Sequence, residues 1–233
     1  MGKGVVKKAF IDTIPVMTGY VVLGIGFGIL LRTNGYGGLW ALAMSVFIYA
    51  GSMQYVLVGL LSGGASFLTT ALTTFMVNAR HLFYGISMID RYKNTGWKKP
   101  YLIFALTDET YSLVCHIPED MDDKESKNYC FLVSLFNQIY WIIGSLLGVI
   151  LGQVVPFSME GIDFALTALF ITIFTDQWLK TKNHLAALIG VGATVICLLI
   201  FGSGNFLVPS MIVIMSLLLG MKRFLKMEDN EDE

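Results

Sequence analysis

Long apolar segments separated by short polar tracts are the feature that most limits how this chain can fold. Eight segments can be marked, at residues 14–31, 39–61, 65–89, 101–117, 129–152, 161–178, 185–201 and 206–221. A helix of about 20 residues crosses the hydrocarbon core of a bilayer, and about 17 are tolerable. Only 14% of the residues are charged, and most of these lie between the segments. We therefore predict an all-α polytopic membrane protein.

Composition and missing motifs narrow the function further. The net charge is −1 and no basic cluster with interleaved aromatic residues occurs, so no nucleic-acid partner is expected. The three cysteines are scattered, which indicates packing roles rather than a metal site. Phosphate-binding loops, zinc-protease pairs and nucleophile elbows are missing from the sequence. We expect no enzyme activity, no metal and no cofactor.

The positions of lysine and arginine indicate the orientation, because cytoplasmic loops carry an excess of both. With eight simple crossings, ten basic residues lie in cytoplasmic tracts and five outside, and only the loop at residues 90–100 violates the rule. If one segment within residues 39–89 is broken or re-entrant and segment 101–117 does not fully cross, the count becomes fourteen to one. Either way, about seven or eight membrane segments, some short, broken or re-entrant, place both termini in the cytoplasm. A single transmembrane domain is expected at residues 1–226, with an acidic, disordered cytoplasmic tail at residues 227–233.

Short patterns recur in the two halves of the chain. The Gly-x-x-x-Gly pattern at residues 24–28 recurs at residues 144–148, and Ser-Met-Gln-Tyr at residues 52–55 has a counterpart in Thr-Asp-Gln-Trp at residues 175–178. Offsets of 120 and 123 residues indicate an internal duplication, as in many secondary transporters. Chance similarity between apolar helices is the alternative explanation. The glycines of the first helix also permit a neighbouring helix to approach closely.

Charged residues inside an apolar segment are the first candidates for function. Arg80 and His81 lie within residues 65–89, and a charge at the centre of a membrane helix costs about 2.5–3.5 kcal/mol even on lenient scales. One helical face there carries Thr70, Thr74, Asn78 and His81, with Arg80 and Tyr84 beside it. This face must look away from lipid. It lines a substrate path in which Arg80 meets a carboxylate, or Arg80 holds the bundle together through Asp108 or Glu109; both hypotheses stay open.

The short segment at residues 101–117 carries two acids, Asp108 and Glu109, which point about 100° apart on a helix. One of them would balance Arg80, and the other would bind an ammonium group or carry protons, since a buried carboxyl is protonated more readily. Alternatively, the segment lies at the membrane surface with its acids in water.

Segment 39–61 is interrupted at Ala50-Gly51-Ser52, which is followed by Gln54. Gly51 permits a helix break, and Ser52 is predicted to be the N-cap of the helix that follows. A helix N-terminus inside the membrane is an anion site suited to an amino-acid carboxylate. Tight packing through small residues is the alternative. Asp176 is a further polar candidate, or else it marks a helix end at the cytoplasmic interface.

Several of these motifs occur together in one known family. Residues 47–55 (Phe-Ile-Tyr-Ala-Gly-Ser-Met-Gln-Tyr) and 77–85 (Val-Asn-Ala-Arg-His-Leu-Phe-Tyr-Gly), with Thr-Asp-Glu at 107–109 and Asp-Gln-Trp at 176–178, resemble the AzlC-type branched-chain amino acid exporter family (azaleucine resistance). The similarity extends over about residues 5–225; Tyr55 stands where many relatives have Phe. The resemblance implies export of valine, leucine, isoleucine or their analogues across the cytoplasmic (inner) membrane. It also implies a small AzlD-type membrane subunit as partner.

The leading hypothesis is therefore a secondary transporter for hydrophobic amino acids, and a non-transporting membrane sensor or scaffold subunit is the alternative. The predicted substrate-binding residues are Gly51, Ser52, Gln54, Asn78, Arg80, His81 and Tyr84. The predicted coupling or charge-pair residues are Asp108, Glu109 and Asp176. A homo-oligomer remains open.

Overall fold

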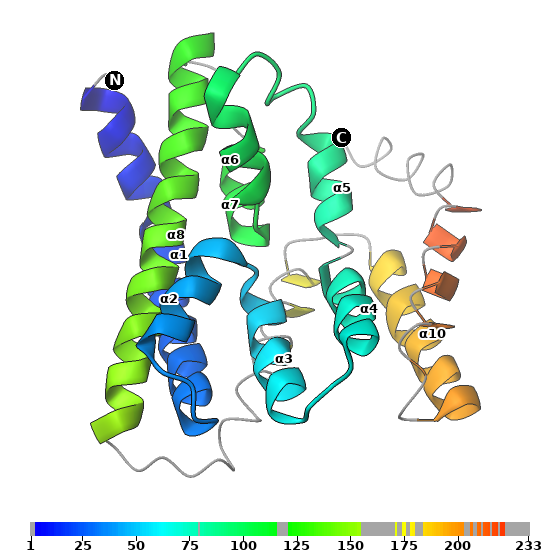
Figure 1. The fold of residues 1–233 in the computed structure, drawn as a ribbon. Helices are drawn as coiled ribbons and strands as arrows, with labels where there is room; N and C mark the ends of the chain where they lie inside the picture. Colours follow the sequence, from blue (N-terminus) through cyan, green and yellow to red (C-terminus); the bar gives the residue numbers. More distant parts are fainter. Residues whose placement is uncertain are drawn as a thin grey trace. The chain divides into compact units, whose positions relative to one another are not determined.

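The structure is a computed structural model in which the chain forms two compact units, Met1–Thr167 and Ala168–Glu233. It describes residues 3–78, 80–115, 121–154, 171, 174–175, 178–179, 184–202, 206, 209–210, 212–214, 216–218 and 220–221. All regular structure in these residues is helical, which confirms the predicted all-α class. Figure 1 shows the order of the elements.

Two long helices, α1 (Lys3–Thr33) and α8 (Asp123–Val154), pack together in the first unit, with the shorter helices around them. They are the two described helices that are long and apolar enough to cross a membrane. They run side by side in the same direction (Figure 1). Their contact is made by glycines: a Cβ added at Gly24 would lie 2.9 Å from the Ser145 nitrogen, and one at Gly144 would lie 2.7 Å from the Val21 oxygen. The two Gly-x-x-x-Gly patterns noted in the sequence therefore pack directly on one another.

The predicted interruption of the second apolar segment is confirmed. Helix α2 (Gly38–Phe47) ends before the break, α3 (Gly51–Ser62) begins after it, and Tyr49 between them has a φ of 43°. The two short helices form a hairpin (Figure 1). One detail of the expectation was wrong, because Ser52 is not the N-cap. Ala50 holds that position without a side-chain cap, and Ser52 lies buried in the first turn.

A second hairpin is made by α6 (Lys99–Phe104) and α7 (Asp108–Val114), which follow the short 3-10 helix η1 (Gly96–Lys98). The turn between the helices ends at Thr107, whose side chain accepts a hydrogen bond from the Thr110 nitrogen and so caps α7. Asp108 and Glu109 lie in the first turn of α7, where the helix dipole favours negative charge. The segment predicted to be short and polar is thus folded back on itself.

The third apolar segment forms α4 (Phe67–Asn78) and α5 (Arg80–Ser87), on either side of residue 79, which lies outside the described part. None of the residues of α4 is fully buried. The predicted inward-facing stripe at Thr70, Thr74, Asn78 and His81 is half-buried rather than enclosed in the described structure.

The first unit has two apolar clusters, one at each end of the long helices. One joins Val5 and Ala9 of α1 to Tyr92, Val114 and Tyr129. The other includes Phe27, Leu31 and Val149, toward the C-terminal ends of α1 and α8. Basic residues gather beside the first cluster: Lys7, Lys8, Arg91, Lys93, Lys98, Lys99, Lys124 and Lys127. Arg32 lies near the opposite end of α1.

In the second unit, helix α10 (Leu185–Phe201) is the longest described element. It begins after His184 and ends at Gly202, which has a φ of 71°. Asp176 and the predicted acidic tail at residues 227–233 lie outside the described residues.

Candidate functional site

The tips of the two hairpins meet beside the middle of α8. The Tyr49 ring, at the tip of the first hairpin, lies with its centroid 6.2 Å from that of Phe104, at the tip of the second. The side chains of Asn137, Gln138 and Trp141 extend from α8 toward the two tips. We call this region, in which two interrupted helices meet, the hairpin junction.

The first hairpin is held to α8 through Trp141. The Trp141 Nε1 donates a hydrogen bond of 3.0 Å to Gln54 Oε1, and Gln54 is fully buried. Gly51 lies against the same indole ring, because a Cβ there would lie only 3.1 Å from Trp141 Cη2. Gly51 thus serves two purposes, since it begins α3 and lets the ring pack against the helix start.

Gln138 links the two hairpins. Its Nε2 donates to the Ser45 and Val46 oxygens, at 3.4 and 3.3 Å, which are carbonyls at the C-terminal end of α2. Its Oε1 accepts a 2.8 Å hydrogen bond from the Tyr101 hydroxyl on α6. A helix that ends inside a protein leaves carbonyls that need donors, and one amide supplies them here while it also contacts the other hairpin.

The second hairpin is held to α1 and α8 by a chain of polar contacts. The Tyr20 hydroxyl on α1 donates to Glu109 Oε2 at 2.7 Å and lies 2.6 Å from Thr107 Oγ1. Thr107 Oγ1 donates to Thr110 Oγ1 at 3.1 Å, and Asn137 Nδ2 donates to the same hydroxyl at 3.0 Å. Asp108 and Glu109 are both half-buried.

Two predicted site residues of α5, His81 and Tyr84, are connected to α7 by aromatic contacts. His81 Nδ1 lies 3.1 Å from the Asn78 oxygen, and its ring packs edge-on against Tyr84. The Tyr84 ring stacks on Tyr111 of α7, with centroids 5.0 Å apart and an interplanar angle of 18°. Arg80 begins α5, but its side chain lies outside the described residues.

The structure therefore brings together most of the predicted site. Gly51, Ser52 and Gln54 lie in the first turn of α3, and Asp108 and Glu109 in the first turn of α7. His81 and Tyr84 reach α7 through the aromatic stack on Tyr111. Asp176 cannot be placed, because it lies outside the described residues.

Sequence reasoning missed the contributions of Tyr20, Tyr49 and α8. Helix α8 carries a buried polar stripe of Ser134, Asn137, Gln138, Trp141 and Ser145. Asn137, Gln138 and Trp141 of this stripe reach the junction, whereas the Ser134 hydroxyl bonds Cys130 on its own helix. These positions recur at intervals of three and four, so they share one helical face. The rule that identified the stripe at residues 70–81 would have found this one.

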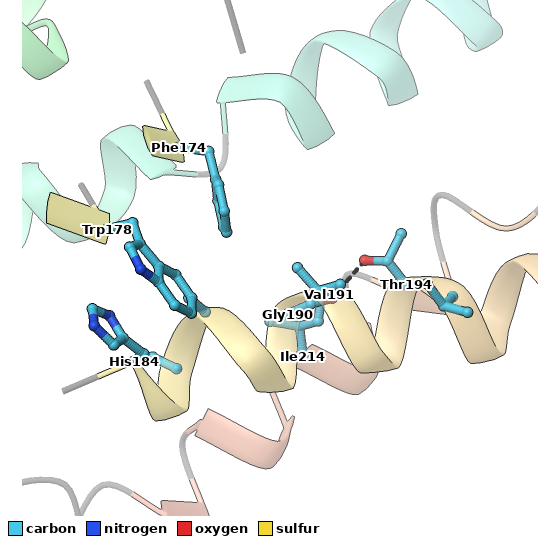
Figure 2. Close-up of a pocket in the computed structure, with 10 residues that line it drawn as sticks. Phe174, Trp178, His184, Gly190, Val191, Thr194 and Ile214 are labelled. Atoms are coloured by element: carbon cyan, nitrogen blue, oxygen red, sulfur yellow. Dashed lines mark hydrogen bonds between the residues drawn. The ribbon is translucent and has the colours of Figure 1, made fainter. Parts of the chain in front are cut away.

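The second unit contains a separate cavity of about 620 Å³. Figure 2 shows its mainly apolar lining between α10 and the side chains of Phe174 and Trp178. The His184 ring stacks on the Trp178 ring, with centroids 3.9 Å apart and an interplanar angle of 3°.

Comparison with known proteins identifies several similar chains. The family model described as AzlC protein matches residues 15–155. A Bacillus subtilis protein, named branched-chain amino acid transport protein AzlC, is 42% identical over 219 residues, which are 93% of this chain and 85% of that protein. An uncharacterized membrane protein of Helicobacter pylori is 41% identical over 93% of this chain and 95% of its own length. The inner membrane protein YgaZ of Escherichia coli is 27% identical, over 79% of this chain and 78% of its own length. No solved structure matches significantly.

Proposed function

Because the chain belongs to the AzlC protein family of membrane transport proteins, we propose that it moves branched-chain and other hydrophobic amino acids out of the cell. The substrates are valine, leucine, isoleucine or their analogues. The membrane is the cytoplasmic (inner) membrane. The B. subtilis relative is named for branched-chain amino acid transport, which supports the proposed substrate class. The E. coli relative is named as an inner membrane protein, which supports the proposed membrane.

The proposed topology has α1 and α8 as crossings in the same direction, with α4 and α5 together crossing back between them. The α2–α3 and α6–α7 hairpins enter the membrane from opposite sides and return. Apart from Arg32 and Arg80, the described basic residues of the first unit then gather at one end, which we assign to the cytoplasm by the positive-inside rule. Both termini lie on that side, and the complete chain has about seven or eight membrane segments.

The observation that carries the proposal is the hairpin junction. Interrupted helices that meet in the interior of a bundle are the usual way in which transporters expose backbone groups to a substrate. Here the N-cap of α3 is Ala50, which has no capping side chain, and the dipole at a helix start favours a carboxylate. Across the junction, Glu109 at the start of α7 accepts a hydrogen bond from Tyr20 of α1. One end of the junction thus favours an anion and the other a cation.

We assign the substrate carboxylate to the α3 N-terminus at Gly51, Ser52 and Gln54, and the ammonium group to Asp108 or Glu109. Arg80 is the second candidate for the carboxylate, and Asn78, His81 and Tyr84 line the path on the α5 side. Asp176 is proposed as a charge-pair or coupling residue of the second unit. Transport requires that the hairpin tips separate toward each side in turn, as in other transporters with broken helices.

A small AzlD-type membrane subunit is proposed as the partner. The exposed large apolar side chains on α2 and α4, among them Leu39, Phe47, Phe67 and Phe75, agree with a chain that is surrounded by lipid and by other membrane segments. Monomeric soluble proteins rarely expose so much apolar surface.

The test is efflux of radiolabelled leucine from vesicles that contain this chain together with its candidate partner. We expect efflux well above that of empty vesicles. The double variant Arg80→Ala with Asp108→Ala should reduce it. Thr18→Val should not, since the Thr18 hydroxyl is exposed and donates to the Ile14 oxygen on its own helix. Unchanged efflux in the double variant would refute the site assignment. A protein that neither moves nor binds amino acids, yet captures a signalling partner, would support the sensor or scaffold alternative.

A further inference from the structure

Two buried amide side chains at the hairpin junction each keep one atom without a hydrogen-bond partner among the described residues. Gln54 on α3 and Asn137 on α8 are both fully buried. Gln54 Nε2 and Asn137 Oδ1 have no hydrogen-bond partner in the described part of the chain, although the other polar atom of each amide is bonded. Unpaired polar groups are rare in protein interiors and costly to maintain, and each one calls for an explanation such as a ligand or an ordered water.

Neighbouring groups determine the free atom of Gln54. The indole N–H of Trp141 can only donate, so Gln54 must present its oxygen to it and leave its NH2 group as a free donor. Asn137 uses its NH2 group on the Thr110 hydroxyl, which leaves its oxygen as a free acceptor. The two amides therefore offer one donor and one acceptor.

The two amides are anchored to α8 at positions one helical turn apart. Trp141, which bonds Gln54, follows Asn137 by four positions on α8, so both side chains leave the same face of that helix, about 6 Å apart along its axis. A ligand that bridges them needs an acceptor and a donor separated by only a few bonds. Both atoms are covered in this structure, so the ligand reaches them when the hairpin tips part.

The surroundings of the two atoms have opposite electrostatic character. Gln54 lies in the first turn of α3, near the positive end of that helix. Asn137 contacts Thr110 in the first turn of α7. The Asp108 and Glu109 carboxylates lie in the same turn, and two negative charges outweigh the partial positive charge of a helix start. A negative group is therefore favoured at Gln54 and a positive group at Asn137.

We propose that Gln54 and Asn137 together recognise the zwitterionic head group common to α-amino acids. The Gln54 NH2 donates to the substrate carboxylate, and the Asn137 oxygen accepts from its ammonium group. This inference rests on the proposed transport function and deepens it by adding a residue of α8 to the site. It also predicts that the protein selects amino acids over the corresponding keto acids and amines, which each lack one of the two charged groups.

The experiment is a competition assay on leucine flux in vesicles that contain the full chain and its partner. Unlabelled leucine, 4-methyl-2-oxopentanoate and 3-methylbutylamine are compared as inhibitors. In the unmodified protein, leucine should inhibit at least about tenfold better than the keto acid or the amine. Asn137→Leu should remove most of the preference over the keto acid, and Gln54→Leu most of the preference over the amine. Ser134→Ala, in which a buried hydroxyl on α8 outside the junction is lost, should change neither ratio.

Several results would overturn the inference while leaving the transport function intact. In one such result, all three compounds inhibit leucine flux equally in the unmodified protein. In another, the Gln54→Leu and Asn137→Leu variants transport leucine with unchanged selectivity ratios. If Asn137→Leu does not fold, Asn137→Asp keeps the acceptor oxygen and should keep the preference over the keto acid, and its loss would contradict the proposal. Leucine flux no greater than in empty vesicles is a failure of the proposed function itself.

Discussion

The hydroxyl of Tyr20 donates a hydrogen bond of 2.7 Å to Oε2 of Glu109, across 89 positions of sequence. This contact joins the middle of the first long helix to the first turn of α7, at the tip of the second hairpin. The same hydroxyl lies 2.6 Å from Thr107 Oγ1, so one phenol holds both the cap of α7 and an acid that we assign to the substrate site. Its loss should therefore affect transport more than folding.

Tyr20→Phe is expected to lower leucine flux several-fold, because Glu109 loses the donor that orients its carboxylate. The free energy of unfolding should fall by only about 1–3 kcal/mol, the range for a hydrogen bond to a charged group. Tyr129→Phe is the matched control, since the Tyr129 hydroxyl donates to Asp12 at 2.8 Å away from the junction. Both variants are compared in the vesicle assay. Equal flux in the two variants would show that the Tyr20 contact has no special role.

Gln138→Leu should destabilise the protein by about 1–3 kcal/mol, because the Tyr101 hydroxyl and the carbonyls at the end of α2 would lose their partner. The measurement is thermal unfolding in detergent. A double-mutant cycle with Tyr101→Phe separates the two hairpins: the coupling energy should be clearly different from zero, since the two residues share a hydrogen bond. Additive effects would indicate that Gln138 does not link the hairpins.

Gly28→Ala is expected to prevent normal assembly of the first unit, because the added Cβ would overlap the backbone of α8 at Ser145 and Gly148. Backbone on both sides cannot move aside without separating the helices. Gly19→Ala on the same helix is the control, since nothing lies within 4 Å of a Cβ there, and alanine favours helix by about 1 kcal/mol. Size-exclusion chromatography of the solubilised proteins should show loss of the monodisperse peak for Gly28→Ala alone.

Thr107→Ala should weaken the start of α7 by about 0.5–2 kcal/mol, the usual cost of losing an N-cap side chain. Thr107→Ser keeps the hydroxyl that accepts from the Thr110 nitrogen and should retain most of the stability. Hydrogen exchange of the amides in residues 108–114 measures the effect locally. Similar exchange in the two variants would argue against a capping role.

Periodicity and glycine positions predicted much of this architecture because they act locally. The interruption before Gly51 was recognised from the small residues around it, and the basic loop at residues 90–100 indicated that a neighbouring segment folds back. Both inferences use short-range physics: backbone freedom at glycine and the placement of charge outside the membrane.

The pairing of elements could not be read in the same way. The residue type of Ser52 favours an N-cap position. The backbone becomes helical already at Gly51, however, so the N-cap is Ala50, two residues earlier. The junction of the hairpins depends on contacts such as that of Tyr20 with Glu109, and no spacing rule connects residues so far apart. Amino acids that pair across a fold leave no periodic signal.

The most direct test asks whether the hairpin tips must part for leucine to pass. Cysteines replace Tyr49 and Phe104, whose ring centroids lie 6.2 Å apart, in a chain whose Cys115, Cys130 and Cys197 are changed to alanine. Leucine flux is then measured before and after treatment with a short thiol crosslinker that a reducing agent can cleave, with each single-cysteine variant as control. We predict that crosslinking abolishes flux only in the double variant and that reduction restores it. Full leucine flux through the crosslinked protein would show that the substrate passes elsewhere.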